Sequence, residues 1–298
     1  MKTTLAQVTT AFLSRDRLVA STLKSYEQTL LSLLKEHGRT PIELVDRQLL
    51  KDYLQSLDDL NYTTHNRHQA IISALFNFAV DEGYIQSNPA SRLNRRKPGR
   101  QRGEHKTDEI IRYLTPSQLD ILYDLVKKSN ARLETIVRLL HRSGARIGEL
   151  LSLELTHINM EQRKFQVVGK GNKQRWCFYS EDAEIALQDY IKYYRHSASR
   201  ALFTAGHPTT KVITPVSYQA VLADWRKVIN QSHELKGIRL HDLRHTFATE
   251  RVGLMAIEEL RALMGHENIQ TTLRYQKITS SRAESVAKSA LNNLVNNI

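Results

Sequence analysis

Four polar side chains near the C-terminal end of the chain have the chemistry to act together on a phosphate group. His241 and Arg244 lie three residues apart in the run HDLRH, so on a helix they share one face. His266 and Tyr275 follow in LMGHENIQTTLRY, where we expect a separate short helix. An arginine can bind the non-bridging oxygens of a phosphate, a histidine can donate or accept a proton, and a hydroxyl can attack. The four residue types therefore predict phosphate chemistry, provided that the fold brings them to one point.

Three more candidate residues lie upstream. Arg146 is placed at the start of a predicted helix, and Glu149 lies three residues on, on the same face, where its carboxylate could orient a guanidinium or an imidazole. Lys170 lies in the turn GKGNK, whose small residues would let a lysine reach a ligand. Each feature also has an ordinary interpretation, as a surface ion pair or an exposed turn lysine. His245 is assigned a structural role, because we expect it to point away from His241.

Composition limits the class of protein. The chain has 298 residues, a formal net charge of +12 and a pI near 9.7, a balance that indicates a polyanionic partner such as nucleic acid. Cys177 is the one cysteine, which excludes a disulfide within the chain and a cysteine-based zinc site. We see no signal peptide and no apolar run of about 20 residues, so we expect a cytoplasmic protein without a membrane segment. No acidic cluster has the spacing of a two-metal site, and we expect neither a metal nor another cofactor.

The first part of the chain predicts a small helical bundle. Apolar residues recur with helical spacing, and Ser, Thr, Asp, Gly and Pro mark the ends of the helices. We expect helices at about 5–13, from Ser21 or Thr22 to Gly38, at 46–57, and from Thr63 or Thr64 to Gly83. Residues 1–92 would form this helical domain. Residues 93–112 are rich in Arg and Lys and predict an exposed basic linker that contacts phosphates.

The second part, 113–298, predicts a larger domain with a little β-structure. Thr115 and Pro116 form a helix start, and further helices are expected at about 131–141, after Gly144, and at 181–195 and 215–231. The runs KFQVV and RWCFY predict a β-hairpin. An amphipathic tail helix is expected at 281–296. The fold class is therefore mainly α with a small antiparallel β-sheet in the second of two domains.

The ordered set of motifs resembles the tyrosine recombinase (phage integrase-type) family. ARIGEL, VGKGNK, HDLRH and MGH, with a tyrosine nine residues later, occur in the family's order, and STLKSY and NRHQAIISALFNFAVDEGYIQSNPA resemble its core-binding domain. The similarity covers nearly the whole chain and is greatest to the simple Xer-type members. By this resemblance Tyr275 would attack a DNA phosphodiester to form a 3′-phosphotyrosine, and Lys170 would protonate the departing 5′-oxygen. Arg146 and Arg244 would neutralise phosphate charge, His241 and His266 would bind the phosphate and assist proton transfer to or from the tyrosine, and Glu149 would support them.

The resemblance also implies an assembly. The two domains would close as a clamp around double-stranded DNA, and a homotetramer would join paired recombination sites, alone or with a paralogue or accessory protein, through a Holliday junction. The tail helix would pack on its own subunit or dock on a neighbour. Two other functions share these features: a type IB topoisomerase or hairpin-forming resolvase, and a non-catalytic DNA-binding regulator.

Overall fold

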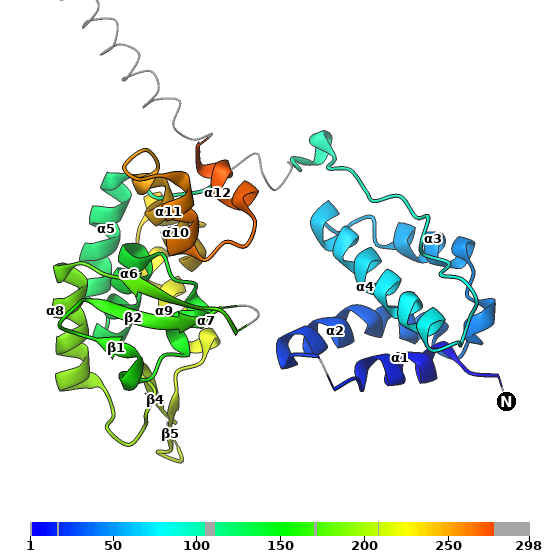
Figure 1. Ribbon diagram of the computed structural model, residues 1–298, viewed down its shortest axis with the longest axis horizontal. Helices are drawn as coiled ribbons and strands as arrows, with labels where there is room; N and C mark the ends of the chain where they lie inside the picture. Colours follow the sequence, from blue (N-terminus) through cyan, green and yellow to red (C-terminus); the bar gives the residue numbers. More distant parts are fainter. Residues whose placement is uncertain (1, 17, 105–110, 170–171, 208, 277–298) are drawn as a thin grey trace, which may run out of the picture. The chain divides into compact units, whose positions relative to one another are not determined.

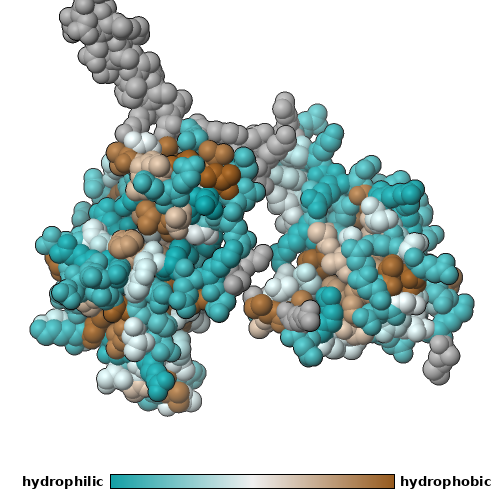
Figure 2. Space-filling view, viewed as in Figure 1, coloured by the Kyte–Doolittle hydropathy of each residue, from teal (hydrophilic) through white to brown (hydrophobic). Residues whose placement is uncertain are grey.

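The computed structural model describes residues 2–16, 18–104, 111–169, 172–207 and 209–276. The chain divides into two compact units, Met1–Glu109 and Ile110–Ile298. In the view of Figure 2, both units present a mainly hydrophilic surface with scattered hydrophobic residues. In the described part of the chain, no helix combines the length and the apolar character needed to cross a lipid bilayer.

The first unit is a bundle of four helices, as the sequence predicts (Figure 1). They are α1 (Leu5–Leu13), α2 (Ala20–His37), α3 (Arg47–Ser56) and α4 (Tyr62–Asp81). The Asp46 side chain caps α3 and the Asn61 side chain caps α4, each accepting a backbone N–H of the first turn. The N-cap of α2 is Val19, so the expected cap at Ser21 or Thr22 is wrong by two to three residues. The core side chains include Phe12, Leu33 and Phe76, all with no exposed surface.

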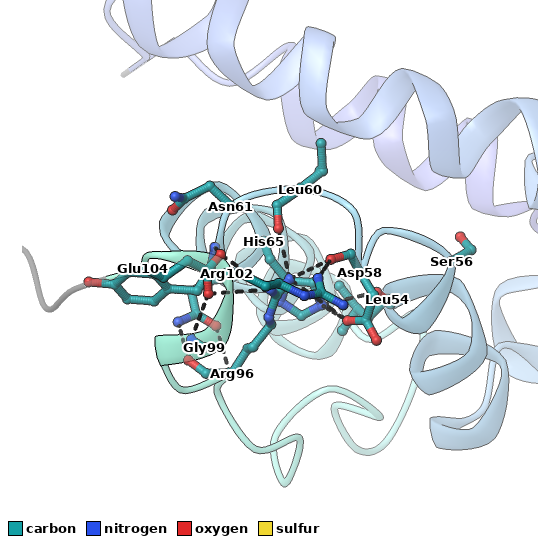
Figure 3. A network of polar contacts seen from close by, with 12 residues as sticks. Leu54, Ser56, Asp58, Leu60, Asn61, His65, Arg96, Gly99, Arg102 and Glu104 are labelled. Atoms are coloured by element: carbon teal, nitrogen blue, oxygen red, sulfur yellow. Dashed lines mark hydrogen bonds and ion pairs between the residues drawn. The ribbon is translucent and has the colours of Figure 1, made fainter.

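The basic segment after α4 folds back on the first unit. The Arg96 guanidinium donates to the carbonyl oxygens of Asp58 and Leu60, at 2.7 Å each. Glu104 is 7% exposed and accepts the backbone N–H of Tyr62 at 2.9 Å and one guanidinium N–H of Arg96 at 3.2 Å. Figure 3 shows this network beside the turn before α4. Residues 96–104 therefore pack on the first unit through Arg96 and Glu104, while Lys97, Gln101 and Arg102 are exposed; the rest of that segment to Ile110 lies outside the described residues.

The second unit combines helices with a three-stranded antiparallel sheet, which confirms the predicted fold class. The sheet has the order β1-β2-β3, and β2 pairs with β3 so that Val168 faces Gln174 and Lys164 faces Phe178. A separate two-stranded pair, β4-β5, was not expected. The elements are α5 (Pro116–Lys127), α6 (Ala131–Ser143), α7 (Ile147–Leu151), β1 (Ile158–Asn159), β2 (Lys164–Val168), β3 (Gln174–Phe178), α8 (Glu181–Asp189), β4 (Thr204–Gly206), β5 (Ile213–Pro215) and α9 (Tyr218–Ile229). The described residues of this unit end with α10 (Leu240–Arg251), α11 (Ile257–Met264) and α12 (Ile269–Gln276).

Helix α6 lies at the centre of this unit, in contact with α5, α8, α9 and α10 (Figure 1). It ends at Gly144, which has a left-handed backbone (φ 65°). A Cβ atom at this position would lie 2.4 Å from the Phe247 ring of α10, so the close approach of the two helices requires glycine. This reversal turns the chain into Arg146 and α7.

Candidate active site

Arg146 begins α7 and is held by the carboxylate that the helical spacing predicted. Its Nη1 donates to Oε1 of Glu149 at 2.8 Å, and its backbone N–H donates to Oε2 at 2.8 Å. Nη2 donates to the carbonyl oxygen of Gly265 at 3.2 Å. The Arg146 side chain is 41% exposed, which leaves its guanidinium accessible to an anion from solvent.

Arg175 on β3 is a member of the site that sequence reasoning missed. Its guanidinium forms two hydrogen bonds with the Glu149 carboxylate, at 2.9 and 2.7 Å, and donates to the carbonyl oxygen of Leu263 at 3.1 Å. Glu149 is 8% exposed; burial alone would raise its pKa, but the hydrogen bonds from Arg175 and Arg146 lower that pKa to about 2. Strand alternation was the available signal, because Arg175 shares the core-facing side of β3 with buried Cys177.

Arg244 joins two segments that are distant in sequence. It is 2% exposed, and its guanidinium donates to the carbonyl oxygens of Gly144, at the end of α6, and Met264, at the end of α11. Burial and the neighbouring cations Arg146 and Arg175 lower the pKa of Arg244 to about 10, so it stays charged at neutral pH. Three guanidinium groups therefore gather around the buried carboxylate of Glu149.

Three histidines lie close to these arginines. His241 and His245 are four residues apart on α10, with ring centroids 4.6 Å apart and planes at 89°. The expectation that they point in different directions is wrong, because residues four apart share a helix face. His266 follows the left-handed Gly265 after α11, and its Nδ1 lies 2.9 Å from Oγ1 of Thr272.

Tyr275 on α12 meets this cluster. It is 3% exposed, and its Oη lies 2.7 Å from Nδ1 of His245. Its ring is parallel to that of His266, with centroids 6.4 Å apart. Burial raises the pKa of Tyr275 even though Arg244 acts to lower it, so burial favours the neutral phenol.

The two histidines beside Tyr275 are neutral at pH 7. Burial, followed by repulsion from Arg244 and Arg146, lowers the pKa of His266 to about 3. Burial and the neighbouring His241 lower the pKa of His245 to about 4. The site thus combines fixed guanidinium charges with neutral imidazoles that can accept protons.

An open cleft adjoins these groups. It measures about 520 Å³ and is lined by Arg146, Lys173, Arg175, Arg261 and His266, among others. This excess of cations suits a phosphate.

Lys170, in the turn between β2 and β3, lies outside the described residues, as does the tail helix expected at 281–296. Within the described ranges, no group of three or more His, Cys, Asp or Glu side chains is arranged to hold a metal ion.

Comparison with known proteins places the chain in a family. A profile of the phage integrase family matches residues 112–282. The tyrosine recombinase XerC of Leptospira interrogans is 25% identical over 254 residues, which cover 84% of this chain and 78% of the relative. XerC of Lactobacillus delbrueckii subsp. bulgaricus is also 25% identical, over 93% of this chain and 95% of the relative. The solved structure of the Tn1549 transposon integrase with transposon right end DNA has a TM-score of 0.72 at 22% identity, covering 96% of this chain and all (100%) of that one. The motif-based resemblance to tyrosine recombinases is confirmed, and the chain belongs to the phage integrase family.

Proposed function

We propose that this tyrosine recombinase cleaves and rejoins DNA at specific sites through Tyr275. The observation that carries the proposal is the convergence of Arg146 with Arg244, His266 and Tyr275, which lie 98 to 129 residues later in the chain, on one part of the second unit. The guanidiniums would neutralise the non-bridging oxygens of a DNA phosphate, whose charge is most concentrated in the transition state. Tyr275 would then attack and form a 3′-phosphotyrosine.

Each remaining site residue has a role in this scheme. Lys170 would protonate the departing 5′-oxygen, and exposed His241 would bind the phosphate. Glu149 and Arg175 would hold the Arg146 guanidinium in place through the hydrogen bonds described above. A phosphodiester is exchanged for another phosphodiester, so the bond energy needed for religation is conserved without ATP.

The proposal extends to the assembly on DNA. The first unit would bind the duplex as a core-binding domain, and the two units would close around it as a clamp. Four copies would hold paired sites and exchange strands through a Holliday junction, with residues 281–296 docking on a neighbouring subunit. The net charge of +12 supports an affinity for DNA that falls as salt rises. Related solved structures are described as a transposon integrase with transposon right end DNA and a lambda integrase dimer bound to a core site.

A covalent-trapping experiment tests the proposal. DNA that the protein selects from a randomised duplex library is rebuilt as a nicked suicide substrate, and the covalent protein–DNA adduct is counted. The protein should form an adduct, Tyr275→Phe should form none, and Tyr218→Phe, at a tyrosine that is 45% exposed on α9, should match the unaltered protein. An adduct with Tyr275→Phe would refute the assignment of the nucleophile.

A second assay separates the alternative functions, which the comparisons do not favour. A supercoiled plasmid with two selected sites should yield recombinant circles. Relaxation without recombination would indicate a topoisomerase, and the absence of any adduct would indicate a DNA-binding regulator.

A further inference from the structure

The contact between His245 and Tyr275 assigns a proton-transfer role that the motif comparison does not. The Tyr275 Oη lies 2.7 Å from Nδ1 of His245, and the ring centroids are 5.8 Å apart. We propose that His245 is the catalytic residue that takes the phenolic proton of Tyr275 as this oxygen attacks the DNA phosphate, and returns it when the DNA is religated. This inference rests on the proposed function of Tyr275 as nucleophile.

Geometry distinguishes His245 from the other two histidines. The Nδ1 atom of His266 lies 2.9 Å from the Thr272 hydroxyl. His241 is exposed and meets the His245 ring edge to face, on the same helix. Among the described residues, the hydrogen bond of the Tyr275 hydroxyl goes to His245. Therefore the imidazole already in hydrogen-bond contact with the attacking oxygen is the one best placed to accept its proton.

The surroundings decide the charge of His245. Burial and the nearby His241 lower its pKa to about 4, so at neutral pH the ring is uncharged and one ring nitrogen is free to accept a proton, although the same shift makes it a weaker base than a free imidazole. The charged and titratable groups that act on the His245–Tyr275 pair are Arg146 at the start of α7, Arg239 at the N-cap of α10, His241, Asp242 and Arg244 on α10, His266 before α12, and Arg274 on α12. The proposed step requires the tautomer that carries the His245 proton on Nε2, in which Nδ1 accepts the hydrogen bond of the phenol.

The step balances without an added reactant. The bond from Oη to phosphorus forms, the bond from phosphorus to the 5′-oxygen breaks, and the Oη proton passes to Nδ1 of His245. The leaving 5′-oxygen takes a proton from an ammonium general acid, the role that the proposed function gives to Lys170. Religation reverses each transfer: protonated His245 returns its proton to the departing tyrosine oxygen.

Replacing His245 by Asn separates proton transfer from positioning. The Asn Oδ1 can still accept the hydrogen bond of Tyr275, but it cannot take the proton. Single-turnover cleavage is measured on a nicked duplex that carries the library-selected sequence, from pH 6 to 9. We expect His245→Asn to cleave about 100- to 1,000-fold more slowly at pH 7 with unchanged DNA affinity. Its rate should rise by up to about tenfold per pH unit, since hydroxide must now remove the proton, whereas the rate of the unaltered protein stays nearly flat.

Two further variants complete the test. Added imidazole should partly restore cleavage by His245→Ala, a result that also shows that this variant folds. His241→Asn is the matched control on the same helix face, and whatever its rate, it should keep the flat pH profile.

Several results would overturn the inference. His245→Asn could cleave within threefold of the unaltered protein with a flat profile, which would make the contact one of position only. His245→Ala could cleave faster than the unaltered protein, which would mean that the contact with His245 holds Tyr275 in an inactive position. Alternatively, His241→Asn could show the rise of rate with pH, which would assign the proton transfer to His241. If Tyr275→Phe is inert while His245→Asn behaves normally, only this inference fails; an adduct with Tyr275→Phe removes the proposed function as well.

Discussion

Replacing Glu149 by Gln tests whether one buried carboxylate organises the arginines of the site. The pKa of Glu149 is about 2 in the folded protein, against an ordinary value of 4.5. That difference corresponds to about 3 kcal/mol of folding stability when the group is ionised in both states. The carboxylate is 8% exposed and receives four hydrogen bonds from Arg146 and Arg175, so solvent screens these interactions little. We therefore expect Glu149→Gln to lower the free energy of unfolding by about 3 kcal/mol at pH 7.

The pH dependence gives the sign of the effect. A folded-state pKa below the unfolded value stabilises the protein above pH 4.5, and this stabilisation is lost as the pH falls from 4.5 toward 2. Urea unfolding at several pH values measures the difference in the free energy of unfolding between the unaltered protein and Glu149→Gln. This difference should therefore shrink to about half near pH 3. Glu267→Gln is the control: this residue lies on the rim of the same cleft, is 58% exposed and pairs with Lys173 at 3.6 Å, so its loss should cost less than about 0.5 kcal/mol. The reasoning would be refuted if the loss of unfolding free energy in Glu149→Gln were constant with pH, or no larger than the loss in the control.

Two further predictions concern the scaffold. Gly144→Ala should destabilise the second unit by about 3 kcal/mol, because its Cβ would lie 2.4 Å from the Phe247 ring in addition to adopting a positive φ. Gly83→Ala, also at a positive φ but with no atom within 4 Å, should cost the first unit only about 1 kcal/mol in urea unfolding, and equal costs would contradict the steric explanation. Glu104→Gln removes the partner of Arg96, so trypsin should cleave the basic segment faster; an unchanged cleavage rate would show that the network does not hold the segment in place.

The sequence by itself determined most of the helices, the hairpin of β2 and β3, and the order of the site residues. Caps and apolar periodicity depend on contacts within a few residues, so the helix start at Thr115 and Pro116 and the cap at Asp46 could be predicted. The pair of Arg146 and Glu149 could be predicted for the same reason, since three residues on one helix separate them. Chain order also predicted the family, because the motifs follow one another at characteristic intervals.

Tertiary structure alone decided which of these side chains meet. Arg175 binds Glu149, 26 residues away in the sequence, and Arg244 binds Gly144, 100 residues away. No local sequence pattern predicts contacts over such separations. Glu104 is buried because it pairs with the backbone 42 residues earlier, which its basic surroundings did not indicate. The hydrogen bond between His245 and Tyr275 spans 30 residues and depends on how α12 packs against α10. Local chemistry thus fixes each helix and its faces, whereas the partners of the buried charges and of the reactive hydroxyl follow from the packing of whole elements.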